Sequence, residues 1–223
     1  MLVIVHGGAW AIGDKSHPGV AAAKVAHWLP SGIAVASVNY RLLPLAGVLE
    51  QAGDVARSIA FLQRRAADWQ LDPARMVLLG HSTGAHLAAL LAADPALASA
   101  AGASPWRATI LLDSAALDAV ELMKAPHLPL YDPAFGSEPS EWPAFSPLHR
   151  LNARPSPILV VHSNRRRDAT GAARRFAAAV QARGGRAEVH EAALSHMELN
   201  AQLGLDNAYT ERVDAFLRSV GVP

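Results

Sequence analysis

The stretch "LLGHSTGAHLAAL" (residues 78–90) joins a strand-like run to an apolar helix through a turn that contains two glycines. Residues 76–80 are typical of a short strand buried on both faces, and residues 85–94 suit a helix packed against a sheet. Between them, Gly80-His81-Ser82-Thr83-Gly84 fits the pattern G-x-S-x-G. At so sharp a turn the serine takes a strained backbone, the glycines relieve the crowding, and the hydroxyl projects at the carboxyl end of the sheet. The stretch therefore predicts that Ser82 is a nucleophile.

Further strand-like runs alternate with helical patterns on both sides of this turn. The strand-like runs cover residues 2–5, 32–38, 108–113, 157–163 and 186–192. The helical patterns cover residues 50–69 and 171–183 and a last segment after Asp206. Such alternation predicts an α/β fold with a mostly parallel sheet and helices on both of its faces. We expect one domain over residues 1–223, because the chain is long enough to bury a single core.

One region interrupts the alternation. Residues 117–157 are rich in proline and aromatic side chains and form neither a strand nor a long helix pattern. We interpret this region as an excursion that lies over one edge of the sheet, where long loops tend to be functional.

The overall composition excludes several classes of protein. The 223 residues carry a formal net charge of +1, which does not suggest a nucleic acid or a membrane surface as a partner. The absence of cysteine excludes a disulfide framework, a thiolate nucleophile and a thiolate metal site. No apolar run is as long as a membrane span, and the first residues do not resemble a signal peptide. We therefore expect a cytoplasmic protein that uses no metal and no cofactor.

A serine hydroxyl needs a base that takes its proton, and an acid that orients this base. His196, in "LSHMELN", is the one histidine in a loop after the final strand-like run. The acid is expected in a loop after an earlier strand, and two candidates fit. We favour Asp168, which follows the penultimate strand; Asp118, which follows the strand before that one, is the alternative.

The stretch "HGGAW" (residues 6–10) directly follows the first strand-like run. Acyl transfer passes through an oxyanion, which preorganised backbone N–H groups stabilise by several kcal/mol. A glycine pair lets the backbone turn its amides toward a substrate. We predict that Gly8 and Ala9, together with Thr83 after the nucleophile, donate these hydrogen bonds.

These motifs resemble the α/β-hydrolase superfamily, in the branch of HGG-motif esterases akin to hormone-sensitive-lipase-like carboxylesterases and kynurenine formamidases. The resemblance covers nearly the whole chain: "HGGAWAIGDK", "VNYRLLP", "LDPARMVLLGHSTGAHLAAL", "FSPLHRL" and "LSHMELNAQLG" occur in the order of the family. It implies a catalytic triad of Ser82, His196 and Asp168, and an oxyanion hole of Gly8, Ala9 and Thr83.

The sequence departs from this family at two places. The segment after the penultimate strand reads "HSNRRRD", in which extra residues displace Asp168 from its usual position. Relatives also carry further strands, and often a helical cap, before the HGG strand. Either the recorded start is internal to a longer product, or this is a trimmed hydrolase whose sheet edge is protected in another way, for instance by a second subunit in a homo-oligomer.

The expected activity is the hydrolysis of short-chain carboxylic esters through an acyl-enzyme, with a small-molecule ester as substrate. If the excursion folds over the site, the walls of the pocket come from Trp10, Tyr131, Phe135 and Trp142. The arginine run at 165–167 is either a solvated loop or a source of positive charge near the site. Two other functions stay open, an arylformamidase with the same triad and a non-catalytic binding protein on a hydrolase scaffold.

Overall fold

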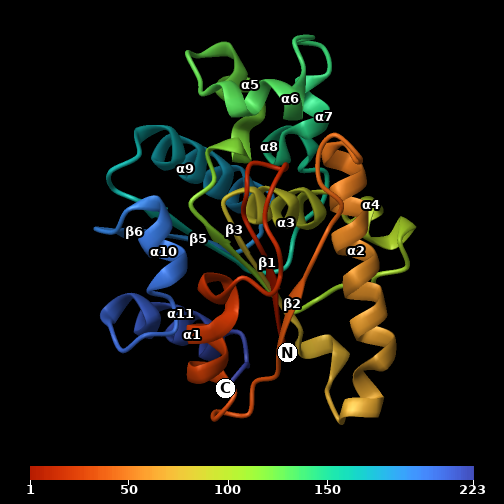
Figure 1. The fold of residues 1–223 in the computed structure, drawn as a ribbon, viewed down its shortest axis with the longest axis vertical. Coiled ribbons are helices and arrows are strands. Elements are labelled where there is room, and N and C mark those ends of the chain that lie inside the picture. The colour runs from red at the N-terminus through yellow and green to blue at the C-terminus, as the bar shows by residue number, and fades with distance from the viewer.

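Six parallel strands form one sheet at the centre of the computed structural model, which describes all residues 1–223 (Figure 1). The order across the sheet is β2-β1-β3-β4-β5-β6, so that the first strand of the chain lies inside the sheet. The strands are β1 (Leu2–Val5), β2 (Val35–Val38), β3 (Val77–His81), β4 (Ala108–Leu112), β5 (Ile158–Ser163) and β6 (Ala187–Ala192). All six strands coincide with strand-like runs of the sequence, and the expectation of an α/β-hydrolase fold is confirmed.

The two faces of the sheet pack against different helices. Val3 and Val5 of β1 belong to the larger core cluster, which includes buried residues of α2, α3 and α9. Leu2 and Ile4 point to the other face, into a cluster shared with α1 and α11. This alternation along one strand explains why a run of four apolar residues is needed there, since both faces are covered.

The helices outside the excursion connect successive strands or follow the last one. They are α1 (Pro18–Trp28), α2 (Val48–Arg65), α3 (Thr83–Ala93), α4 (Pro95–Ala100), α9 (Arg167–Ala182), α10 (His196–Ala201) and α11 (Ala208–Ser219). Short 3₁₀ turns lie at η1 (Ala66–Trp69) and η2 (Pro73–Arg75). The last helix begins at Ala208, because Asn207 caps it by accepting a hydrogen bond from the N–H of Thr210.

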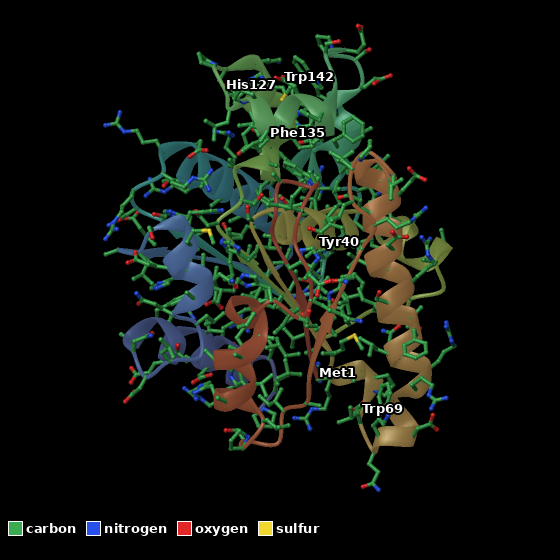
Figure 2. All side chains as sticks on the ribbon, in the orientation of Figure 1. Met1, Tyr40, Trp69, His127, Phe135 and Trp142 are labelled. Carbon is green, nitrogen blue, oxygen red and sulfur yellow. The ribbon has the colours of Figure 1, made fainter.

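The predicted excursion is a group of short helices between β4 and β5, at one end of the molecule (Figure 1). Its elements are η3 (Ala115–Asp118), α5 (Ala119–Lys124), η4 (Pro129–Tyr131), α6 (Asp132–Phe135), α7 (Trp142–Phe145) and α8 (Pro147–Arg150). Figure 2 shows His127, Phe135 and Trp142 together in this part of the structure, far from Trp69. The segment lies beside the residues that follow β1, because the ring of Phe135 packs 5.0 Å from the ring of Trp10.

The strand β2 forms an edge of the sheet. A hollow of about 820 Å³ lies along it, between β2 and α2, and is lined by none of the side chains predicted for the functional site.

No helix of the structure combines the length and the apolar character that crossing a bilayer requires.

Candidate active site

Ser82 lies between the end of β3 and the start of α3, with a φ of +55°. This left-handed conformation is strained for a residue with a side chain, and close backbone packing around the turn imposes it. A Cβ on Gly80 would lie 2.2 Å from the carbonyl oxygen of Gly84, and a Cβ on Gly84 would lie 2.1 Å from that of Val5. Both glycines of the motif are therefore required by the contact between β3, α3 and β1.

The side chain of His196 faces Ser82, with 3.0 Å between Nε2 and the serine Oγ. His196 is the first residue of α10, and the sequence fixes this helix start. Ser195 is the N-cap, and Glu198 completes a capping box: its carboxylate accepts from the N–H of Ser195 at 2.7 Å. The local sequence "SHME" thus places His196 at the beginning of a helix, directly over the carboxyl end of the sheet.

Asp113 accepts a hydrogen bond from the other ring nitrogen of His196, with 2.6 Å between Nδ1 and Oδ2. It directly follows β4 with a φ of +52°, and its side chain is fully buried. The second carboxylate oxygen accepts from the backbone N–H of Ser163 at 2.9 Å. Burial raises the pKa of Asp113, but the hydrogen bonds from His196 and Ser163 and the charge of Arg166 outweigh this effect and hold the pKa at about 2. The carboxylate is therefore ionised at neutral pH.

The structure contradicts the choice of Asp168 as the partner of His196, because Asp113 occupies that place. The loop after β5 is short, and Asp168 lies in the first turn of α9, where its exposed carboxylate pairs with Arg166 at 2.7 Å. Asp118, the alternative, accepts from the N–H of Glu121 at the start of α5 and from Arg175 Nε at 2.7 Å. Neither aspartate contacts His196.

Two arginines of the run at 165–167 differ in their surroundings: one is solvated, and the other places positive charge near the site. Arg165 is exposed and lies 3.5 Å from Glu198. Arg166 instead turns toward the site, where its Nη1 lies 3.0 Å from Asp113 Oδ2 and 2.9 Å from His196 Nδ1. Because His196 Nδ1–H donates to Asp113, the guanidinium acts on this pair through Asp113, whose ionised form it favours.

The glycine loop after β1 packs against the elbow. A Cβ on Gly7 would lie 3.0 Å from the Cβ of Ser82, so this glycine permits the close approach. Gly8 and Ala9 both have positive φ, of 137° and 50°, and their N–H groups donate to no protein acceptor. Thr83, the first residue of α3, also carries an N–H without an intrahelical acceptor. The structure thus brings all three predicted oxyanion donors to the region of Ser82, and their role stays a prediction.

The four aromatic residues predicted as pocket walls are all buried, each with at most 8% of its surface exposed. Three form one cluster: the ring of Trp10 lies 5.0 Å from that of Phe135 and 5.9 Å from that of Tyr131. Trp142 is further along the excursion and donates its Nε1–H to the carbonyl of Gly136 at 3.1 Å. The excursion therefore packs onto the glycine loop, but the contact of these rings with a substrate stays a prediction.

His86 connects the glycine loop to the excursion, a role that the sequence did not reveal. Burial lowers its pKa to about 4, so the ring is neutral. Its Nε2 donates to the carbonyl of Phe145 at 2.7 Å, which leaves Nδ1 to accept from Trp10 Nε1–H at 3.3 Å.

The sequence is similar to those of several known proteins. The family model BD-FAE matches residues 1–104. Esterase LipQ of Mycobacterium tuberculosis is 30% identical over an alignment of 227 positions, which covers 95% of this chain and 52% of that protein. The probable isoprenylcysteine alpha-carbonyl methylesterase ICMEL1 of Oryza sativa subsp. japonica is 36% identical over 89 residues, or 40% of this chain and 20% of that protein. The chain thus spans about half, or less, of the length of these curated relatives.

Solved structures of esterases share the fold over nearly the whole chain. Thermogutta terrifontis esterase 2, in a form phosphoramylated by tabun, superposes with a TM-score of 0.77 at 24% identity, covering 99% of this chain and 83% of that one. Esterase B from Lactobacillus rhamnosis superposes with a TM-score of 0.76 at 18% identity, covering 98% and 74%. At these identities the likeness concerns the fold. Together with the relatives in sequence, it leads to one conclusion: the chain has the α/β-hydrolase fold and is similar in sequence to esterases.

Proposed function

We propose that this protein is a serine hydrolase that cleaves carboxylic esters through an acyl-enzyme intermediate. The observation that carries the proposal is the continuous chain of contacts from Ser82 Oγ through His196 to Asp113, with distances of 3.0 Å and 2.6 Å. An ionised Asp113 keeps the imidazole proton on Nδ1, so Nε2 is free to accept the serine proton. This is the arrangement that a nucleophilic serine requires.

In the proposed reaction, Ser82 Oγ attacks the ester carbonyl while His196 Nε2 takes its proton. The resulting oxyanion accepts hydrogen bonds from the N–H groups of Thr83, Gly8 and Ala9. It lies at the N-terminus of α3, where the helix dipole also favours negative charge. His196 then gives the proton to the leaving alcohol. Water, deprotonated by the same nitrogen, attacks the acyl-enzyme, releases the carboxylic acid and restores Ser82.

We further propose that short acyl chains are preferred. The rings of Trp10, Tyr131 and Phe135 pack against one another beside the glycine loop, and such a wall leaves little depth for a long chain. Structures of the Thermogutta terrifontis enzyme with bound propionate and with bound butyrate support the choice of acyl chains of this length for the test.

The test compares the wild type with Ser82→Ala on p-nitrophenyl esters from acetyl to decanoyl. We expect kcat to fall by at least about 10³-fold in the variant, since the nucleophile is absent. Ser31→Ala, at an exposed serine outside the site, is the matched control and is expected to keep the wild-type rate. A fluorophosphonate probe identifies the labelled residue independently, by peptide mass.

Three results would contradict parts of the proposal. Activity of Ser82→Ala within tenfold of the wild type refutes the serine mechanism. A higher kcat/KM for decanoyl than for butyryl esters refutes the short-chain preference. Faster turnover of N-formylkynurenine than of every ester would replace the esterase by an arylformamidase that uses the same residues.

A further inference from the structure

His81, the residue before the nucleophile, lies directly against His196. Its Nε2 is 2.9 Å from the backbone carbonyl oxygen of His196, and the two ring centroids are 4.6 Å apart with a tilt of 36°. His81 is the last residue of β3 and is 95% buried, since only 5% of its surface is exposed. Its other ring nitrogen faces the glycine loop, where a Cβ on Gly7 would lie 3.1 Å from Nδ1.

The protonation state of His81 follows from its surroundings. Burial, together with the nearby ring of His196, lowers the pKa of His81 to about 3, so the imidazole is neutral at neutral pH. A neutral imidazole carries one proton. Because a carbonyl oxygen accepts and cannot donate, the proton lies on Nε2, and Nε2–H donates to the carbonyl of His196.

The position of His196 needs such a restraint. Its side chain is 29% exposed, and α10, which it begins, has only six residues. The contacts of its ring with Ser82 and Asp113 fix the imidazole only if the backbone below it stays in place. The hydrogen bond from His81 attaches that backbone to the end of β3, the same strand end from which Ser82 projects. The nucleophile thus directly follows β3, and the base is attached to the last residue of the same strand.

We propose that His81 is a positioning residue for His196: through Nε2–H and through the contact of the two rings, it holds the backbone and the imidazole of His196 at hydrogen-bond distance from Ser82. This proposal rests on the proposed function, because it assigns His81 to the same reaction. His81 does not touch the substrate or exchange a proton with it. Its contribution is to keep the distance between the serine oxygen and the histidine nitrogen within the range in which proton transfer is efficient.

Two amide substitutions separate this role from simple filling of the core. In His81→Gln the side-chain amide nitrogen occupies nearly the place of the imidazole Nε2 and can still donate to the carbonyl of His196. In His81→Asn the amide is shorter, reaches only to the place of Nδ1 and cannot make that hydrogen bond. Both variants bury an amide at the same site, so the pair differs mainly in the hydrogen bond under test.

The experiment measures kcat and KM of both variants on p-nitrophenyl butyrate, with thermal unfolding as a check on stability. We expect His81→Asn to lose about 10- to 100-fold in kcat, because a displacement of the base by about 1 Å costs this much. Its KM is expected to stay within about threefold of the wild type, since ground-state binding is untouched. His81→Gln is expected to recover most of kcat. The downfield NMR signal of the His196 Nδ1 proton, which reports the bond to Asp113, should broaden in His81→Asn and persist in His81→Gln.

The outcomes distinguish this proposal from the one on which it rests. If Ser82→Ala is inactive but His81→Asn and His81→Gln both match the wild type in kcat and in the NMR signal, the positioning role is refuted and the serine mechanism stands. If the two variants lose kcat equally, in proportion to their loss of stability, His81 only fills the core. If Ser82→Ala retains the wild-type rate, the proposed function itself fails.

Discussion

Replacement of Asp113 by asparagine is the most direct test of the site, because the side chain keeps its size but loses its negative charge and exchanges one acceptor oxygen for a donor NH₂ group. In the wild type, Oδ2 accepts from His196 Nδ1 and from Arg166, and the other oxygen accepts from the N–H of Ser163. An asparagine offers one acceptor and one donor at these two places. With its oxygen toward Ser163, its NH₂ group faces two donors; after a flip of the amide, the NH₂ group faces the N–H of Ser163.

Each orientation of this asparagine has a cost that can be estimated. When the NH₂ group faces His196, the imidazole must move its proton to Nε2 to accept at Nδ1, and it can no longer take the proton of Ser82. The equivalent replacement in a serine protease lowers kcat by about 10⁴-fold, and we expect a fall of about 10³- to 10⁴-fold here. Either orientation also leaves a buried donor without an acceptor, which lowers the free energy of unfolding by about 1–3 kcal/mol.

The assay compares Asp113→Asn with Asp168→Asn on p-nitrophenyl butyrate, and urea unfolding measures the stability of both. Asp168 is exposed and pairs only with Arg166, so we expect its variant to keep kcat within about threefold, as the small energies of exposed ion pairs suggest. If Asp168→Asn were the inactive variant and Asp113→Asn nearly normal, the assignment of the acid from the geometry would be refuted. Equal, small losses in both would show that the acid contributes little to catalysis.

Two further predictions concern the scaffold. Gly84→Ala is expected to lower the free energy of unfolding by more than about 3 kcal/mol, because the new methyl group would lie 2.1 Å from the backbone oxygen of Val5. The control is Gly53→Ala in α2, where the nearest atom would be 3.5 Å from the new methyl group, and this variant should be more stable than the wild type by up to about 1 kcal/mol. Equal effects of the two substitutions on urea unfolding would contradict the packing argument. Lys24 is buried, and burial lowers its pKa from 10.5 to about 8 in the folded protein. Between these values the unfolded chain binds more protons, so the stability of the wild type rises with pH across this range. The unfolding free energy of Lys24→Met relative to the wild type should therefore fall by roughly 3 kcal/mol from neutral pH to about pH 11, and a difference that does not change with pH would show that burial does not lower the pKa of Lys24.

The fold and the pairing of Ser82 with His196 could be predicted because each has a local signature. The strands are short apolar runs, and G-x-S-x-G marks a strand-to-helix turn. "SHME" contains the capping box that begins α10 at His196. In each case the decisive residues are close together in the sequence, so that their spacing carries the information.

The contact of Asp113 with His196 could not be predicted in this way, because the position of Asp113 depends on which strands are neighbours. Asp113 ends the run "ATILLD" and looks like the last residue of a strand. Its place becomes meaningful only with the register of the sheet, in which His81 of β3 lies opposite Leu112 of β4. The residues that follow these two, Ser82 and Asp113, then emerge side by side. The choice of Asp168 relied on the more usual strand and could not anticipate that α9 begins at Arg167.

The unusual backbone conformations of the protein are concentrated at this end of the sheet. Five non-glycine residues have positive φ, and all except Gln70 lie at the site: Ala9, Trp10, Ser82 and Asp113. Each such residue costs of order 1–3 kcal/mol, and it persists only where the surroundings allow no alternative. Ser82 and Asp113 directly follow the adjacent buried strands β3 and β4. Ala9 and Trp10 lie in the glycine loop, which packs against the turn at Ser82. The interior of the sheet therefore offsets the strain, and the strained residues carry the side chains and the amides that the proposed reaction needs.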